Sequence, residues 1–276
     1  MKLSYRTEQN AKATSALWGK PIENKSPYNI NSLSEEDAEI FIFDVLGFPF
    51  NDINAMIREI SSIKAKNLLV RLNSPGGDPI DTFALYHELK NHKAKVTVRI
   101  EAMAASSASF LALAGNEVQA YSSSLMMIHN CFVVAVGNRF ELAEIGDILE
   151  KIDTNMQDIY TAKTKIGKRE MSQMMKDETW LNANEMKEKG FIDTILTSGK
   201  AAKALFDLSI FAHVPNDLIP EGNNEPTIRD LEKALRDAGL SKNSAKAILA
   251  RGWKAGNAEE EVIKAAQKTL NILKGG

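Results

Sequence analysis

Apolar residues along the chain follow two spacings, one typical of buried strands and the other of amphipathic helices. Short runs of strand-forming residues predict strands over Glu39–Leu46, Asn67–Leu72, Lys95–Ile100, Glu117–Ala120, Leu125–His129 and Phe132–Val136. Apolar residues three or four positions apart predict helices over Asp52–Lys64, Ile80–Asn91, Phe140–Ile166 and Asn182–Lys189. Strands that alternate with helices in this order predict an α/β fold with a parallel sheet and right-handed crossovers.

Changes in composition divide the chain into four parts. Residues 1–37 are polar and contain two prolines, which predicts a flexible N-terminal arm. Residues 38–200 carry the alternating strands and helices. Residues 201–226 predict a linker, because proline, glycine and asparagine are concentrated near its end. Residues 227–276 predict three short helices, with Thr227 as an N-cap and Gly239 as a C-cap of the first.

The segment Ala102–Gly115 combines small apolar residues with three serines in its first half. It follows an alternating strand, so we expect a strand, a sharp turn and then a helix. This arrangement places Ser106 at a helix N-terminus, where unpaired N–H groups favour negative charge. Two interpretations follow from this segment: a nucleophilic serine, or a helix whose hydroxyls bond to backbone carbonyls.

Two further features fit acyl transfer if they converge on Ser106. His129 follows a buried apolar strand, and strand ends in α/β sheets are where sites form. A core histidine bonded to backbone is the alternative. The turn Ser74-Pro-Gly-Gly77 follows another strand, and its two glycines allow backbone amides to approach a ligand closely. An ordinary turn is the alternative here.

Composition excludes several other classes of function. The net charge of the chain is −2, and the basic residues near Leu231–Arg251 are balanced by acidic ones, which argues against nucleic acid as a partner. The single cysteine, Cys131, fits a reducing compartment. The first residues lack the apolar core of a secretory signal, and no apolar run approaches the length of a membrane span. We therefore expect a soluble cytoplasmic protein with no metal and no cofactor.

Five motifs occur in an order that resembles the Clp protease proteolytic-subunit family. They are Asn73-Ser-Pro-Gly-Gly77, Ala104-Ala-Ser-Ser-Ala-Ser109, Met126-Met-Ile-His129, Trp180-Leu-Asn-Ala-Asn-Glu185 and Gly190-Phe-Ile-Asp193. The resemblance covers Glu39–Leu196 and is closer to the phage and prophage branch, whose members act as head-maturation proteases. It implies the Clp-protease/crotonase-like fold of repeated β-β-α units, with a projecting handle helix over Phe140–Ile159.

The resemblance also implies a role for individual residues. Ser106 corresponds to the nucleophile and His129 to the general base. The backbone amides of Gly77 and Ser107 correspond to the oxyanion hole. The acidic member precedes Trp180 by a short step, which favours Glu178 over its neighbour Asp177. The family usually has aspartate there, so a glutamate is a departure, as is Ala102 where the family often has glycine.

These correspondences imply an oligomeric, ring-forming serine endopeptidase that processes phage capsid or head proteins without an ATPase, in the bacterial cytosol or the procapsid. The C-terminal helices resemble scaffolding or targeting tails of such proteases. One alternative is a general Clp-type peptidase that works with an ATP-dependent unfoldase. Another is a catalytically silent assembly protein, and an acyl-CoA hydratase or isomerase is a more distant one.

Overall fold

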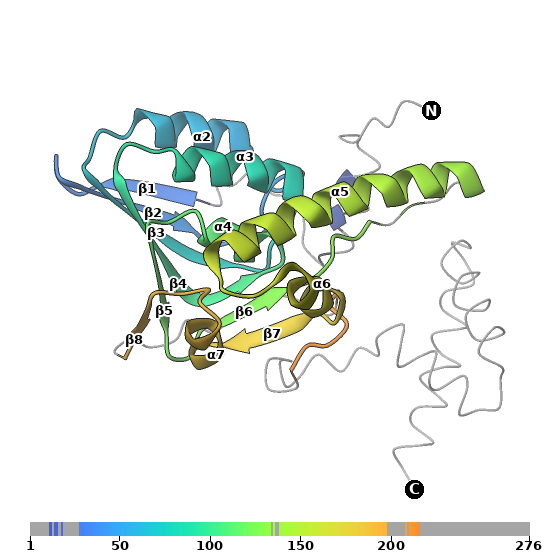
Figure 1. Cartoon of the computed structure of the whole chain (residues 1–276). Coiled ribbons are helices and arrows are strands. Elements are labelled where there is room, and N and C mark those ends of the chain that lie inside the picture. Colours follow the sequence, from blue (N-terminus) through green and yellow to red (C-terminus); the bar gives the residue numbers. More distant parts are fainter. Residues whose placement is uncertain are drawn as a thin grey trace, which may run out of the picture. The chain divides into compact units, whose positions relative to one another are not determined.

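The structure is a computed structural model that describes residues 28–133, 138–197 and 210–215, together with Ala11, Lys12, Thr14, Ser15, Trp18, Ala135 and Leu208. The predicted linker and C-terminal helices of residues 216–276 lie outside these described residues, as does most of residues 1–27. The described part is mixed α/β (Figure 1).

An eight-stranded sheet forms the centre of the fold, and its main path runs β1-β2-β3-β4-β5-β8. The strands are β1 (Tyr28–Ser32), β2 (Asp37–Ile42), β3 (Asn67–Ser74), β4 (Lys95–Ala105), β5 (Glu117–Tyr121), β6 (Leu125–Ile128), β7 (Thr179–Asn182) and β8 (Thr194–Leu196). Strands β2, β3, β4, β5 and β8 are mutually parallel, and β1 is antiparallel to β2. The predicted parallel sheet is therefore correct for its centre.

β4 is longer than its neighbours and pairs with three strands. Its first half pairs with β5 through Thr97–Ile100, and its second half pairs with β6 through Met103–Ala105. β6 in turn pairs antiparallel with β7. The sheet therefore divides along β4, and the end of β4 is flanked by β3 and β6.

Six helices connect these strands in the described part of the chain: α2 (Ile53–Ser62), α3 (Pro79–Lys90), α4 (Ser107–Ala112), α5 (Arg139–Lys163), α6 (Lys168–Lys176) and α7 (Ala183–Glu188). In Figure 1, α2 and α3 lie side by side over one face of the sheet, and α5 projects well beyond it. Asn138 caps α5 with a reciprocal capping box. Its side chain accepts from the Glu141 amide, and the Glu141 side chain accepts from the Asn138 amide. None of these helices is both long and apolar enough to cross a membrane.

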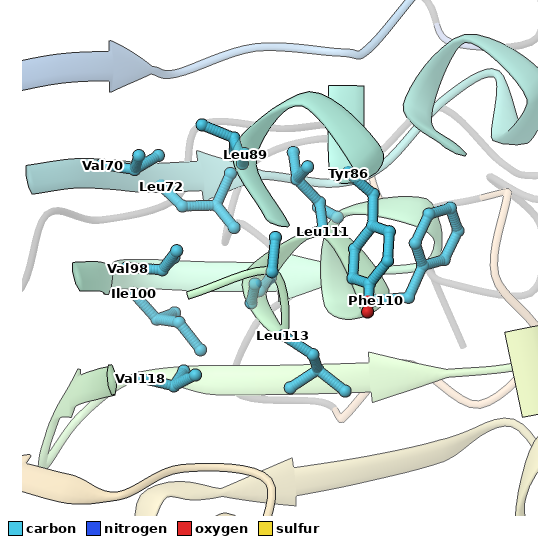
Figure 2. Close-up of a cluster of buried hydrophobic side chains, with 14 of the residues drawn as sticks. Val70, Leu72, Tyr86, Leu89, Val98, Ile100, Phe110, Leu111, Leu113 and Val118 are labelled. Atoms are coloured by element: carbon cyan, nitrogen blue, oxygen red, sulfur yellow. The ribbon is translucent and has the colours of Figure 1, made fainter. Parts of the chain in front are cut away.

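The part of the hydrophobic core nearest the site lies between the sheet and helices α3 and α4. Val70, Val98 and Val118 project from three adjacent strands and are fully buried (Figure 2). Phe110 on α4 faces them and stacks on Phe83 of α3, with ring centroids 4.7 Å apart. Because α4 consists entirely of buried residues, the turn that precedes it is held firmly against the sheet.

Several predicted elements differ from the structure. Tyr28–Ser32, assigned to the irregular arm, forms edge strand β1, because antiparallel pairing with β2 compensates for its polar sequence. The prediction of a strand over Phe132–Val136 is wrong for Phe132 and Val133, which belong to no strand. The polar segment Asp177–Trp180 predicts a loop, but Thr179 and Trp180 belong to β7 (Thr179–Asn182), which pairs with β6. The helix predicted to end at Ile166 ends at Lys163.

Candidate active site

The turn that holds Ser106, the predicted nucleophile, joins the end of β4 to the start of α4. Ser106 occupies it with φ 53° and ψ −127°, a backbone conformation that residues with a Cβ rarely adopt. The Ser106 amide donates to the Met127 carbonyl of β6 at 2.9 Å. Position 76 in the neighbouring loop requires glycine, since a Cβ on Gly76 would lie 2.6 Å from the Ser106 Cβ.

The strand register brings the predicted nucleophile and base together. Ala105 of β4 pairs with Met127 of β6, and the two strands run in the same direction. Ser106 and His129 therefore leave the sheet at the same edge. The Ser106 Oγ lies 2.7 Å from the His129 Nε2, which is hydrogen-bonding distance for proton transfer.

Two backbone amides beside this pair have no hydrogen-bond acceptor among the described residues. The Gly77 loop is held by the Leu46 amide and carbonyl, which bond to Gly76 and Asp78 and leave the Gly77 N–H unused. The Ser107 N–H is the first of α4 and has no intrahelical partner. A Cβ on Gly76 would lie 3.0 Å from the Ser107 nitrogen, which places the glycine loop against that amide.

The carbonyl of Ser106 is fixed by a hydroxyl relay that sequence reasoning missed. The Ser109 amide donates to this carbonyl at 2.9 Å, and the Ser109 Oγ donates to it at 2.5 Å. The Tyr160 hydroxyl of α5 lies 2.7 Å from the same Ser109 Oγ, and both residues are fully buried. Because a trans peptide points its C=O and N–H in opposite directions, fixing the Ser106 carbonyl also orients the Ser107 N–H.

Comparison with known proteins identifies the family of the chain. The family model described as Clp protease matches residues 38–199, more than half of the chain. The chain belongs to the Clp protease family. A curated relative, the ATP-dependent Clp protease proteolytic subunit of Oltmannsiellopsis viridis, is 31% identical over 137 residues, which is 49% of this chain and 70% of that protein.

The Clp protease family consists of serine peptidases, and its proteolytic subunits form ring oligomers. The match ends at residue 199, so residues 208–215 lie beyond it. Within the described part of the chain, no three histidine, cysteine or carboxylate side chains are placed to hold a metal ion.

The two carboxylates considered for the third position lie in different surroundings. Asp177 caps the end of α6, is exposed, and accepts from the Gln173 side chain at 2.8 Å. Glu178 is half-buried with φ 52°, and its charge partly offsets the lowering of the His129 pKa that burial causes. Its hydrogen bonds go elsewhere, to the amides of Ala212 and His213 at 2.8 and 2.6 Å and to the Trp180 indole at 3.4 Å.

The surroundings of His129 are apolar. The residue is 7% exposed, and its ring meets the rings of Phe132 and Phe211 edge-on, with centroids 5.7 and 5.6 Å away. Burial lowers the pKa of His129 to about 4, and this effect exceeds the opposing effect of Glu178. His129 is therefore neutral at pH 7, which is the form that accepts a proton.

The chain after His129 is anchored to α5 by one carboxylate. Asp153 accepts from the Asn130 side chain and from the Cys131 amide, both at 2.6 Å. Burial raises the pKa of the Cys131 thiol to about 12, so it remains protonated and unreactive. Asp153 is not predictable from the sequence, because it is separated from His129 by most of the long helix.

Proposed function

We propose that this chain is a serine endopeptidase in which Ser106 is the nucleophile and His129 the general base. The observation that carries the proposal is the 2.7 Å contact between the Ser106 Oγ and the His129 Nε2 beside two unused amides. His129 takes the Ser106 proton as the hydroxyl attacks a peptide carbonyl, and the Gly77 and Ser107 amides stabilise the oxyanion. The imidazolium then protonates the leaving amine, and water hydrolyses the acyl-enzyme by the same route.

We assign Glu178 rather than Asp177 as the acidic residue that orients His129. The support is electrostatic: the Glu178 charge acts on His129, whereas Asp177 is exposed and bonded to Gln173. The carboxylate of Glu178 is bonded to the Ala212 and His213 amides, so it orients His129 only when those contacts are released.

Covalent labelling tests the nucleophile directly. A fluorophosphonate probe should modify the full-length wild type at Ser106, as located by mass spectrometry. Ser106→Ala should abolish labelling, and His129→Ala should slow it by more than about 10³-fold, because the serine loses its base. Ser124→Ala, which removes another fully buried hydroxyl bonded to the Ile100 carbonyl, serves as the matched control and should label normally.

Absence of labelling in the folded wild type and in its Phe211→Ala and His213→Pro variants, with or without substrate peptide, would contradict the proposal and favour an assembly protein. Hydrolysis of peptides by Ser106→Ala at the wild-type rate would contradict it equally.

We also propose that the chain acts as a homo-oligomeric ring. Support comes from α5, which projects from the body and leaves Phe140, Leu142 and Ile148 exposed at 71%, 45% and 42%. Large apolar side chains gathered on one helix are typical of a subunit interface. Sedimentation of the full chain should show a multimer, and replacing these three residues with serine should shift it to smaller species.

For the substrate, we propose phage capsid or head proteins, cleaved without an ATPase. This proposal rests on the resemblance of the motifs to the phage branch. The alternative is a peptidase fed by an ATP-dependent unfoldase, and it is favoured by the relative whose name includes the words ATP-dependent. Cleavage of an assembled capsid or scaffold protein by the purified chain alone would support the first proposal. Cleavage limited to short unfolded peptides would support the second.

A further inference from the structure

A short segment beyond the family match covers the base. We call Leu208 and residues 210–215 the C-terminal strap. The side chains of Leu208 and Phe211 are each 6% exposed, so the strap is packed against other residues of the protein. The Phe211 ring meets the ring of His129 edge-on at 5.6 Å, that of Trp180 at 6.0 Å and that of Trp18 at 6.1 Å.

The same strap also binds the acidic residue. The Ala212 amide donates to one oxygen of Glu178 at 2.8 Å, and the His213 amide donates to the other at 2.6 Å. No hydrogen bond joins Glu178 to His129 in the described part of the chain. Two backbone amides thus hold the carboxylate in the way that they would hold a bound anion.

We propose that the C-terminal strap is an internal inhibitor, which keeps Glu178 from orienting His129 and seals the imidazole from solvent. When the strap leaves, both oxygens of Glu178 lose their amide donors, and the carboxylate is free to accept from the His129 Nδ1. This inference rests on the proposed function, because it assumes that Ser106 and His129 catalyse. It goes beyond that function by making activity conditional on a segment outside the protease match.

Two physical effects make the closed state a poor catalyst. An imidazole without a partner on Nδ1 is not fixed in the tautomer that receives the serine proton on Nε2. Burial under Phe211 also disfavours the imidazolium that must form in the transition state, which agrees with the lowered pKa of His129. Opening the strap removes both effects together.

A substitution at one exposed position of the strap tests the amide contact. His213→Pro removes the N–H that donates to Glu178, whereas His213→Ala keeps it and removes only the side chain. We expect His213→Pro to accelerate fluorophosphonate labelling of Ser106 about tenfold, the change expected from losing one hydrogen bond to a charged group. His213→Ala should label at the wild-type rate.

A second experiment tests the aromatic contact. Phe211→Ala should also accelerate labelling, and a synthetic peptide spanning residues 208–215 should slow that variant again when added in excess. Phe43→Ala, which truncates an aromatic residue that contacts Phe41 instead, is the control and should behave as wild type.

The outcomes separate the two proposals. Labelling of the wild type, His213→Pro and Phe211→Ala at one rate, or slower labelling of these two variants, would overturn the inhibitor while leaving the peptidase intact. Failure of all variants to label Ser106 would overturn the peptidase itself.

Discussion

Two residues other than glycine adopt a left-handed backbone in the described part of the chain, and they are the proposed nucleophile and the proposed acid. Ser106 has φ 53° and Glu178 has φ 52°. The surroundings of Ser106 come from the sheet and the core: Met127 bonds its amide, and Ser109 bonds its carbonyl. Glu178 sits in a turn between α6 and β7, and its carboxylate is held by the C-terminal strap.

The difference shows that the two ends of the catalytic apparatus are stabilised in separate ways. Strain at Ser106 is balanced by buried packing that exists whenever the domain is folded. The position of Glu178 depends on two amides of the C-terminal strap, which in our proposal detaches while the core stays folded. The turn that holds Ser106 is therefore organised whenever the domain is folded, whereas the position of the Glu178 carboxylate depends on the C-terminal strap.

The largest effect is expected at Gly77, beside the turn that holds Ser106. A Cβ there would lie 2.0 Å from the Leu46 carbonyl, so Gly77→Ala must displace the loop and its amide. We expect peptide hydrolysis to fall by about 10²–10³-fold, the usual loss for one oxyanion donor, together with reduced thermal stability. Gly167→Ala has no atom within 4 Å of the new Cβ and should change neither quantity. Normal activity in Gly77→Ala would exclude this amide from the oxyanion hole.

A smaller effect is expected in the hydroxyl relay. Ser109→Ala removes the side-chain bond to the Ser106 carbonyl and loosens the orientation of the Ser107 amide. We expect kcat to fall about tenfold with KM unchanged, since one buried hydrogen bond that matters mainly in the transition state is lost. Tyr160→Phe should lower kcat less, because Tyr160 acts through Ser109. If Ser124→Ala lowers kcat equally, the relay is only structural.

The acidic end should respond weakly until the strap is opened. Glu178→Gln in the wild type should lower kcat by only about threefold, because the carboxylate makes no bond to His129 there and acts through charge alone. The same substitution in the His213→Pro background should cost about tenfold or more. Asp177→Asn should have no effect in either background. Equal losses of kcat from Glu178→Gln in the wild type and in His213→Pro would show that the contribution of Glu178 does not depend on the His213 amide.

The smallest effect concerns stability beside the oxyanion loop. Burial, and to a lesser degree the charge of Asp81, raise the pKa of Asp78 to about 6 from 3.8. The folded state binds the Asp78 proton more tightly, so this residue lowers stability as pH rises from about 4 to 6. Asp78→Asn keeps an acceptor for the Ile80 amide and should raise the free energy of unfolding at pH 7 by about 1–2 kcal/mol.

His129 gives the opposite slope in the same window. Its pKa is lowered to about 4 in the folded state, so the unfolded state binds the extra proton between about pH 4 and 6.5, and stability rises with pH there. Urea unfolding of Asp78→Asn should therefore show a steeper increase over this range than the wild type. A parallel pair of curves would contradict the raised pKa of Asp78.

The proximity of Ser106 and His129 follows from the sequence, because it depends on the order of strands and turns along the chain. Buried strands that run parallel bring their carboxyl ends to one edge, so Ser106 and His129 follow from apolar runs and from the residue after each run. The Gly76–Gly77 turn follows in the same way. Residues 107–112, in the middle of Ala102–Gly115, form α4, but residues 102–105 continue β4, since β3 and β6 supply partners that local propensity does not reveal.

What the sequence does not predict depends on contacts between distant segments. Ser109 and Tyr160 are 51 residues apart, and neither belongs to a motif that points to the other. Asp177 and Glu178 are adjacent and chemically alike, so only the turn geometry separates them. Phe211 and the strap lie in a region whose composition predicts a linker, and nothing in that composition indicates packing against His129.

The division of β4 between two partner strands has a consequence for how such a chain can change in length. Residues 97–100 are tied to β5 and residues 103–105 to β6, with the nucleophile directly after them. One inserted or deleted residue between these halves would turn the following side chains to the opposite face of the sheet unless a bulge absorbed the change, and the β3–β4 register already shifts at this place in β4. It would also carry Ser106 away from His129. We therefore expect related proteins that keep this chemistry to vary in the length of their loops but to keep the number of residues between Thr97 and Ser106.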